Sequence, residues 1–304
     1  MVDVTIVIPT YKRPDRIVRA VKSALNQTIA SKEIIVVDDN GKGSKEAKET
    51  EKALESFIRD HTIIYLQNEE NSGGSFSRNQ GLNIAQGKYI TFLDDDDEID
   101  PTKLEKQVSK LEELGEEYSA CYVGYHKLLE DGSSYKSNET VNGYVYPYAL
   151  SRSIYNGSGS NLLVRTSIAK EIGGYDISFK RNQDLEFMAR LLKNYKLAYV
   201  DEDLMTIHYE IREVKRSYAE LVMIDKHFID TFNDEIDSLP ENQRKAVYQI
   251  IALERWRYSL SRNAQKDAIK YMKENGVTLN IFIKYIGYLM DRVIGKKSYG
   301  FKLF

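Results

Sequence analysis

The sequence has little of what several common kinds of binding or cross-linking require. Its single cysteine, Cys121, excludes an intramolecular disulfide and a zinc site built from cysteines, and is typical of a reducing compartment. The 43 Lys and Arg are balanced by 46 Asp and Glu, and the formal net charge of −3 argues against a protein that coats nucleic acid through bulk positive charge. We therefore expect a cytoplasmic protein that does not bind nucleic acid.

Long apolar runs, repeats and low-complexity blocks are also missing. No segment approaches the roughly 20 apolar residues of a membrane-spanning helix. The first apolar run, residues 4–8, predicts a buried strand and not a secretory signal, because it lacks a basic region followed by a long apolar core. We expect a chain that is soluble or peripheral to a membrane, with one large domain or two.

Short apolar runs alternate with helix-period segments over the first hundred residues. The runs cover residues 4–8, 33–37, 62–66 and 89–93, and the helical segments between them cover 17–25, 44–59 and 75–86. This alternation predicts an α/β fold with a mostly parallel sheet and crossover helices.

The regular alternation ends after Pro101. A helix to Leu114 precedes a hairpin around the turn at 130–133 and a tyrosine-rich extended stretch. Further strands are predicted at 160–164, 196–200 and 204–209, and helices near 166–172 and 183–194. From about Lys215 the pattern is helical, with interruptions at Pro240 and Gly276.

An acidic run, residues 94–98, directly follows the apolar strand at 89–93. Carboxylates crowded at the end of a strand repel one another unless a cation is present, and oxygen ligands suit Mg²⁺ or Mn²⁺. A second acidic pair, Asp38-Asp39, follows the strand at 33–37. Ligands of open parallel sheets bind beyond the carboxyl ends of the strands, so both acidic segments and Pro9-Thr10-Tyr11 are expected at one crevice. The alternative for residues 94–98 is a solvated acidic loop, and the alternative for Asp38-Asp39 is a simple turn.

A glycine- and hydroxyl-rich linker, residues 68–79, brings Arg78 to the first turn of a helix, where an anion could bind. No G-x-G-x-x-G follows the first strand, and the sequence contains no G-x-x-x-x-G-K-[ST]. Rossmann dehydrogenases and P-loop NTPases are therefore disfavoured.

Several motifs stand in a fixed order along residues 2–210. They are Val-Ile-Pro-Thr-Tyr at 7–11, Ile-Val-Val-Asp-Asp at 35–39, Ser-x-Ser-Arg-Asn-x-Gly at 75–81, Gly-Lys-Tyr-Ile-Thr-Phe-Leu followed by four Asp at 87–97, Gly-Gly-Tyr-Asp at 173–176 and Gln-Asp-Leu-Glu-Phe at 183–187. In these motifs the chain resembles the inverting family 2 glycosyltransferases of the GT-A fold, of the bacterial polysaccharide and glycoconjugate type. The resemblance implies a nucleotide-sugar-binding half over 1–100, an acceptor-binding and catalytic half over 101–214 and a helical C-terminal extension over 215–304.

The resemblance also implies an activity and roles for particular residues. A hexosyl or N-acetylhexosaminyl group would pass from a nucleotide diphosphate sugar, usually a UDP-sugar, to a hydroxyl of a glycan or lipid-linked acceptor. The implied nucleotide and diphosphate contacts are Pro9, Thr10, Tyr11, Arg13, Asp39, Arg78, Asp94 and Asp95, with Asp39 accepting from the uracil and Asp94 or Asp95 nearer the ribose. Asp96 would bind Mn²⁺ or Mg²⁺, and His208 would either be a second metal ligand or have a structural role.

The resemblance makes Asp184 the general base. Gln183 departs from the family pattern, which has Glu at this position, and this leaves the acceptor contacts open. Asp184 could instead merely complement the dipole of the helix that it begins. A non-catalytic carbohydrate-binding or scaffold protein is the alternative to the enzyme. A sugar-nucleotide pyrophosphorylase is disfavoured, because no glycine-rich basic loop follows the first strand.

The end of the chain combines basic and aromatic residues. Residues 279–304 contain five Lys or Arg and one Asp, together with the aromatic residues Phe282, Tyr285, Tyr288, Tyr299, Phe301 and Phe304. This mixture suits a peripheral contact at the inner face of the cell membrane. Packing on the globular core or on a second subunit of a homodimer explains it equally well.

Overall fold

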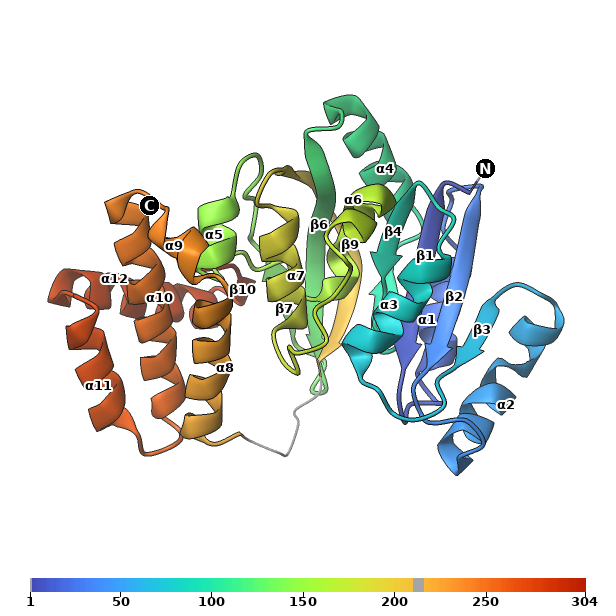
Figure 1. Cartoon of the computed structure of the whole chain (residues 1–304), viewed down its shortest axis with the longest axis horizontal. Helices are drawn as coiled ribbons and strands as arrows, with labels where there is room; N and C mark the ends of the chain where they lie inside the picture. Colours follow the sequence, from blue (N-terminus) through green and yellow to red (C-terminus); the bar gives the residue numbers. More distant parts are fainter. Residues whose placement is uncertain (1, 210–215) are drawn as a thin grey trace. The chain divides into compact units, whose positions relative to one another are not determined.

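The structure is a computed structural model that describes residues 2–209 and 216–304. The chain divides into two compact units (Figure 1). Unit 1 combines Met1–Tyr144 with Asn156–Tyr209, and unit 2 combines Val145–Tyr155 with Glu210–Phe304. The two halves predicted within residues 1–214 therefore share one unit, except that 145–155 join the C-terminal helices.

Unit 1 is built on a twisted sheet whose first four strands are parallel. Its strand order runs β3-β2-β1-β4-β8-β6-β7. The parallel strands are β1 (Val4–Thr10), β2 (Lys32–Asp38), β3 (Ile64–Gln67) and β4 (Tyr89–Phe92). β8 (Leu163–Arg165) runs antiparallel between β4 and β6 (Tyr118–Leu129).

β7 and two strands outside this order, β9 and β5, also belong to the sheet. β7 (Ser134–Ser137) forms an antiparallel hairpin with β6, and β9 (Lys196–Tyr209) runs parallel to β6. The short β5 (Glu98–Ile99) pairs with β9. The predicted hairpin around residues 130–133 is confirmed.

Helices cover both faces of the sheet in Figure 1. Those of unit 1 are α1 (Ile17–Leu25), α2 (Lys45–Arg59), α3 (Gly74–Ile84), α4 (Lys103–Leu114), α6 (Thr166–Glu171) and α7 (Gln183–Leu191), with one 3₁₀ turn at Gly159–Asn161. On one face, Ile6 and Ile8 share a buried cluster with Ile17 of α1 and Leu104 of α4.

The opposite face of β1 carries α3 at very close range. Val7 points to this face because side chains alternate along a strand. A Cβ on Gly81 of α3 would lie 2.4 Å from Val7 Cγ1, so only glycine lets the helix approach this closely. This contact holds α3 against β1.

Unit 2 consists mainly of helices. They are α5 (Tyr146–Leu150), α8 (Tyr218–Thr231), α9 (Asn233–Asp237), α10 (Glu241–Ser259), α11 (Gln265–Glu274) and α12 (Leu279–Ile294), followed by the short β10 (Lys297–Ser298). Its core is a cluster that includes Ile250, Leu253, Tyr285 and Phe301. None of the helices in residues 2–209 and 216–304 has the length and apolar character needed to cross a membrane.

The structure corrects three of the predicted elements. α5 forms within the tyrosine-rich stretch that was expected to be extended, with Pro147 in its first turn. The strand predicted at 160–164 begins as the 3₁₀ turn, and β8 starts only at Leu163. The segments 196–200 and 204–209 form the single strand β9, which keeps its pairing with β6 through register shifts. The predicted helical start at Lys215 lies outside the described residues.

Candidate active site

The candidate site lies at the edge of the sheet where β1, β2 and β4 end. Thr10 and Asp38 are the last residues of β1 and β2 and pair with each other in register. Phe92 ends β4, and the acidic run begins two residues later at Asp94. Because parallel strands end at the same edge, the structure brings these segments together as the sequence predicted.

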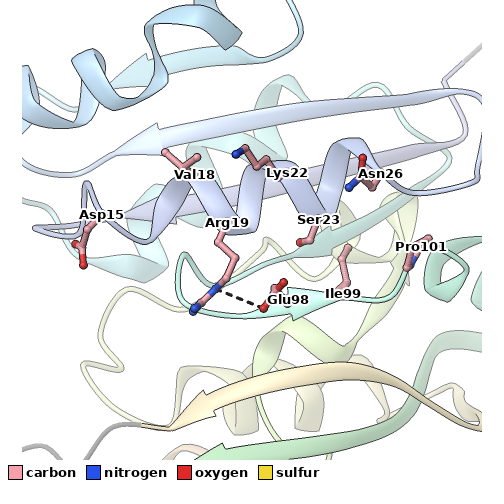
Figure 2. A pocket seen from close by; sticks show the side chains of 9 residues that line it. All are labelled: Asp15, Val18, Arg19, Lys22, Ser23, Asn26, Glu98, Ile99 and Pro101. Atoms are coloured by element: carbon pink, nitrogen blue, oxygen red, sulfur yellow. Dashed lines mark ion pairs between the residues drawn. The ribbon is translucent and has the colours of Figure 1, made fainter. Parts of the chain in front are cut away.

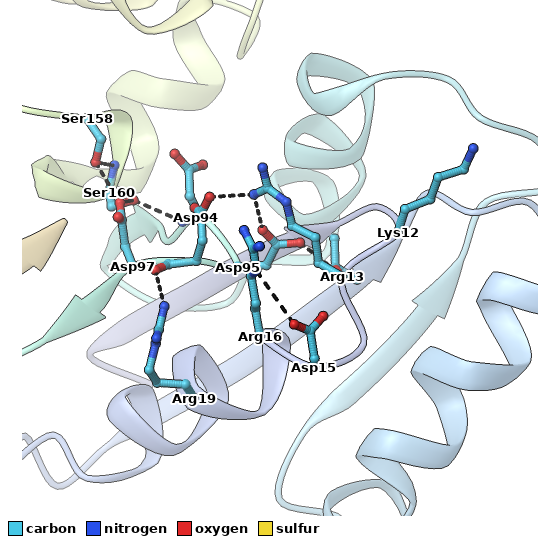
Figure 3. A network of polar contacts seen from close by, with 12 residues as sticks. Lys12, Arg13, Asp15, Arg16, Arg19, Asp94, Asp95, Asp97, Ser158 and Ser160 are labelled. Carbon is cyan, nitrogen blue, oxygen red and sulfur yellow. Dashed lines mark hydrogen bonds and ion pairs between the residues drawn. The ribbon is translucent and has the colours of Figure 1, made fainter. Parts of the chain in front are cut away.

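Arg13 ties the loop after β1 to the acidic run (Figure 3). Its Nη1 atom donates to Asp95 Oδ1 at 2.8 Å and to Asp96 Oδ2 at 2.6 Å. Thr10 Oγ1 donates to the other Asp95 oxygen at 2.7 Å. Asp95 is buried, and this burial raises the pKa of its carboxyl, although the charge of Arg13 and the bond from Thr10 act in the opposite direction.

The remaining carboxylates of the run form a compact cluster. Asp94, Asp96 and Asp97 each offer an oxygen, and these oxygens all lie within 4.8 Å of one another. Burial raises the pKa of Asp97 to about 8, and the charges of Asp94 and Asp96 add to the increase. Ser158 and Ser160 donate to Asp97 Oδ2 at 2.8 and 2.6 Å and so hold this carboxyl in place (Figure 3).

This cluster fits a hard divalent cation. Oxygen donors are the ligands that Mg²⁺ and Mn²⁺ prefer. Burial raises the pKa of Asp97 and the charges of Asp94 and Asp96 add to the increase, so a cation at this position would favour the ionised form of the cluster. Among the residues that the structure describes, Asp94, Asp96 and Asp97 could therefore hold such an ion.

Arg78 links the acidic cluster to the start of α7. Its Nη2 atom donates to Asp94 Oδ1 at 2.6 Å, and its Nη1 atom donates to Gln183 Oε1 at 3.2 Å. The guanidinium carbon lies 5.3 Å from the ring centre of Tyr175. Burial lowers the pKa of Arg78, but the charge and hydrogen bond of Asp94 together with Tyr175 and the charge of Asp184 outweigh burial, and the pKa is raised. Arg78 is thus a cation held between two parts of the site.

Asp184 is the second residue of α7. The helix begins after Asn182, whose φ of 59° is left-handed and turns the chain into the helix. A Cβ at Gly159 would lie 3.7 Å from the Cβ of Asp184 and 3.8 Å from the hydroxyl of Tyr175, so these three residues are neighbours. Burial raises the pKa of Asp184, and the charge of Asp94 raises it further.

Asp39 is buried and is engaged by the linker that follows β3. Its Oδ1 atom accepts from Asn68 Nδ2 and from the backbone N–H of Ser72, at 2.7 and 2.9 Å. Its Oδ2 atom accepts from Asn71 Nδ2 and from the backbone N–H of Gly73, at 3.2 and 2.8 Å. These four donors match the acceptor capacity of a carboxylate. Asp39 therefore holds the loop that leads into α3. This role does not depend on the contact with a nucleotide base that the sequence predicts.

Pro9 and Tyr11 flank Thr10 at the end of β1. Pro9 is part of the ladder with β2, opposite Val37. Tyr11 is 42% exposed, and Lys12 Nζ lies 5.0 Å from the centre of its ring. The exposed ring of Tyr11 offers a flat surface at the edge of the site.

His208 lies on β9 and bonds to Glu98 of β5. The distance from His208 Nε2 to Glu98 Oε2 is 2.7 Å, and Arg19 Nε lies 3.6 Å from the same oxygen. Within residues 2–209 and 216–304, the potential metal-binding group does not include His208. A groove of about 480 Å³ runs beside Arg19 and Glu98 between α1 and β5 (Figure 2).

Reasoning from the sequence missed three residues that hold the acidic cluster. They are Ser158 and Ser160, which bond Asp97, and Arg19, whose Nη2 atom donates to the backbone carbonyl of Asp96 at 2.6 Å. Arg13, Arg16 and Arg19 recur every three residues, and this spacing could have indicated that Arg19 faces the same side. We find no corresponding signal for the two serines.

Comparison with known proteins gives similarities in sequence. The family model described as Glycosyl transferase family 2 matches residues 5–173. The putative colanic acid biosynthesis glycosyl transferase WcaA of Escherichia coli (strain K12) is 37% identical over 262 residues, which cover 81% of this chain and 88% of that relative.

Solved structures are similar in fold. S. aureus TarS 1-349 in complex with UDP-GlcNAc superposes with a TM-score of 0.65 at 18% identity, covering 96% of this chain and 81% of that one. The mannosyltransferase PcManGT from Pyrobaculum calidifontis, in complex with GDP-Man and Mn²⁺, gives a TM-score of 0.57 at 14% identity over 95% of this chain and 80% of that one. The predicted fold class, a GT-A-type sheet flanked by helices with C-terminal helices, is confirmed.

Proposed function

Because the chain belongs to glycosyl transferase family 2, as its motifs predicted, we propose that it transfers a sugar from a UDP-sugar to a hydroxyl group with inversion at the anomeric carbon. That it is a glycosyltransferase follows from the family. The donor, the stereochemistry and the roles of individual residues are the proposal, and they concern unit 1.

One observation carries the proposal: Arg78 contacts both Asp94 of the acidic cluster and Gln183, the neighbour of Asp184. A diphosphate leaving group and an acceptor hydroxyl must lie on opposite sides of one sugar carbon in a direct displacement. The bonds of Arg78 link the carboxylate cluster to the start of α7, which carries Asp184, and this supports a site where both ends of the displacement meet.

Asp184 acts as the general base in this proposal. It takes the proton of the acceptor hydroxyl as that oxygen forms a bond to the anomeric carbon, while the bond from this carbon to the diphosphate oxygen breaks and its electron pair leaves with the diphosphate. The raised pKa of Asp184 supports the role, because a carboxylate with a pKa closer to neutrality is a better proton acceptor. No covalent sugar–enzyme intermediate is needed.

Arg13 and Arg78 bind the diphosphate and balance the charge that develops on it. Arg13 is pre-positioned by Asp95 and Asp96, and Arg78 by Asp94 and Gln183. Preorganised charges of this kind stabilise a transition state because they need no rearrangement during the reaction. Asp96, with Asp94 and Asp97, would hold Mn²⁺ or Mg²⁺, which when bound supplies Lewis-acid neutralisation of the leaving diphosphate.

The nucleoside binds beyond the ends of β1 and β2 in this proposal. Tyr11 offers its exposed ring, and Pro9 and Thr10 form the backbone beside it. Asp95 contributes by fixing Thr10 and Arg13. Asp39 can accept a hydrogen bond from the uracil only if one of its four present donors moves away. Its main contribution is therefore to hold the shape of the loop after β3.

The donor is a UDP-hexose or a UDP-N-acetylhexosamine, and the acceptor is a growing polysaccharide or a lipid-linked glycan. TarS was solved with UDP-GlcNAc, and WcaA is named for colanic acid biosynthesis, which supports a polysaccharide role. The single cysteine, Cys121, is a buried thiol, and burial raises its pKa to about 12. A buried, unpaired thiol is compatible with a reaction on the cytoplasmic side.

A screen of nucleotide sugars tests the proposal. UDP-glucose, UDP-galactose, UDP-GlcNAc and GDP-mannose are each incubated with the protein and Mn²⁺ or Mg²⁺, and the release of free nucleotide is measured. We expect release from one of the UDP-sugars, no release with EDTA, and weaker UDP binding by an Asp96→Ala variant when metal is present.

Each alternative gives a different result. Release from GDP-mannose alone would replace the UDP assignment. Sugar binding without turnover of any donor would favour the non-catalytic protein. Equal UDP binding by wild type and Asp96→Ala, with and without metal, would contradict the metal site.

A further inference from the structure

Helix α12 of unit 2 is apolar on two opposite sides. One side faces the core of the unit, where Tyr285 and Tyr288 are buried against Phe301. The other side is exposed. A helix that is apolar all round is usually enclosed, so the exposed side needs an explanation.

The exposed apolar residues form one continuous stripe, which we call the α12 stripe. Leu279, Ile283, Met290, Val293 and Ile294 are 74%, 59%, 55%, 66% and 77% exposed, and Ile286 is half-buried between them. At about 100° per residue, these six positions fall within a sector of roughly 100°. The stripe therefore runs along the whole helix on one side.

This stripe is not the set of residues that the sequence suggested for a membrane contact. The aromatic residues of 279–304 pack inside unit 2: Trp256 meets Phe282 edge-on at 4.8 Å, and Phe304 stacks on Tyr148 at 4.7 Å. Packing on the core thus explains the aromatic residues. It leaves the aliphatic residues of α12 unexplained.

The charges beside the stripe discriminate between a lipid surface and a second copy of the chain. Lys284, which lies on the polar side of α12 about 80° round the helix from the nearer edge of the stripe, and Lys296, just after the helix, are exposed. The single acidic residue of 279–304, Asp291, bonds Lys297 Nζ at 3.1 Å and the Tyr299 hydroxyl at 2.6 Å. With five Lys or Arg and one Asp, residues 279–304 therefore carry a net positive charge. Anionic lipid headgroups attract this net positive charge, whereas two copies of the segment that approach each other in a dimer repel through it.

We propose that the α12 stripe rests on the surface of a membrane that contains anionic lipids, with its aliphatic side chains at the boundary between headgroups and acyl chains and with Lys284 and Lys296 on the headgroups. The inference concerns unit 2 and does not depend on the donor, the acceptor or the catalytic residues of unit 1. It would hold a glycosyltransferase at the surface where lipid-linked acceptors are exposed.

Vesicle flotation of the full chain tests this proposal. Vesicles of phosphatidylcholine alone are compared with vesicles that contain about 30% phosphatidylglycerol. We expect the protein to float with the anionic vesicles, and high salt to reduce the bound fraction. Two sets of variants separate the contributions: Ile283→Gln with Val293→Gln and Ile294→Gln removes the stripe, and Lys284→Glu with Lys296→Glu reverses the charge.

Each set should lower binding to anionic vesicles about tenfold or more. The matched control is Met223→Gln, an equally exposed apolar residue of α8 at 70% exposure, and it should float as wild type does. UDP binding and thermal midpoint are measured on every variant. If the stripe variant does not fold, the charge variant alone decides.

Two outcomes would overturn the proposal. In the first, wild type does not float with anionic vesicles. In the second, sedimentation without vesicles reveals a concentration-dependent dimer that the stripe variant abolishes while no protein floats, and the stripe is then a contact between two copies. Failure of the donor assay with intact flotation would contradict the proposed function and leave this inference standing.

Discussion

Asp184 differs from an ordinary carboxylate at the start of a helix. The first turn of a helix stabilises negative charge and should lower a carboxyl pKa. The pKa of Asp184 is nevertheless raised, because burial and the charge of Asp94 outweigh the helix. A raised pKa gives no advantage to a residue that only caps α7. It favours a residue that accepts a proton.

Replacing Asp184 with Asn should separate catalysis from folding. The amide cannot take the proton of the acceptor's hydroxyl group. We therefore expect kcat to fall by roughly 10² or more, while UDP affinity and the thermal midpoint stay close to those of wild type. Asp234→Asn, in the first turn of α9, is the matched control and should change kcat little. Near-normal turnover of Asp184→Asn would mean that the base lies elsewhere, and lost UDP binding would assign Asp184 to the donor.

The pH profile of kcat should report the same residue. A base works in its ionised form, and a raised pKa means that Asp184 becomes protonated at a higher pH than a free carboxyl does. Turnover should therefore fall as the pH drops, with a midpoint above the ordinary aspartate value of about 4. The measurement is kcat at saturating donor from pH 4 to 8, and constant turnover across this range would exclude Asp184 as a base that titrates there.

Sheet topology could place the residues of the site that follow a strand end, whereas Arg78 and Asp184 were predicted from the linker pattern and the family resemblance. Asp94, Asp95 and Asp96 follow an apolar run directly, and their position beyond the sheet follows from its topology. The bonds of Arg13 to Asp95 and Asp96 join positions more than eighty residues apart, and no local pattern contains that information. Ser158 and Ser160 were missed for the same reason.

At the scale of elements, the linker between β3 and α3 depends on one carboxylate. Asp39 receives four bonds from Asn68, Asn71, Ser72 and Gly73, and it has 3% exposure. Gly73, with its φ of 91°, adds backbone freedom to the linker, and the bonds to Asp39 restrain it.

Asp39→Asn should loosen this linker. The new amide group turns one acceptor into a donor that faces other donors, so we expect a loss of about 1–3 kcal/mol in the free energy of unfolding, together with weaker UDP binding. The measurement is urea unfolding of the protein without nucleotide. Glu69→Gln, at an exposed position of the same linker, is the control. Weaker UDP binding with unchanged stability would show that Asp39 contacts the nucleotide directly and does not hold the loop.

The sequence predicted the long, periodic elements and missed short ones such as α5, β5 and β10. β1, β2 and β4 are mostly apolar, and α1 has one apolar stripe, so composition and periodicity identify them. α5 has only five residues, fewer than two turns, and a helix of this length has no detectable period. Its residues fold as a helix because they pack within unit 2, and tertiary packing is not visible in a local window.

At the scale of the whole molecule, the proposed catalytic residues and the α12 stripe belong to different units. Every residue proposed for donor binding and catalysis belongs to unit 1. Unit 2 holds its own buried charge network, in which Asp225 bonds Arg152 at 2.7 Å and Arg255 at 3.0 Å. All three side chains are buried.

Asp225→Ala should therefore lower stability without changing donor affinity. The variant leaves two buried guanidinium groups without their carboxylate, and removal of one partner from a buried ion pair typically costs about 3–5 kcal/mol. Thermal unfolding and UDP titration below the new midpoint measure the two effects. Asp230→Ala, an exposed ion-pair residue on the same helix, should do little to either. A large loss of UDP affinity in the folded Asp225→Ala protein would contradict the separation of tasks.

The ion pair between Arg13 and Asp96 has a consequence for the order in which ligands arrive. In the free protein the guanidinium competes with any divalent ion for the same carboxylate, and a diphosphate would draw Arg13 away from it. Nucleotide and metal should then promote each other's binding, and linkage requires the factor to be the same in both directions. Calorimetric titration of Mn²⁺ with and without UDP measures that factor. In an Arg13→Gln variant, Mn²⁺ alone should bind more tightly and the coupling factor should shrink. Nucleotide and metal would then bind almost independently of each other.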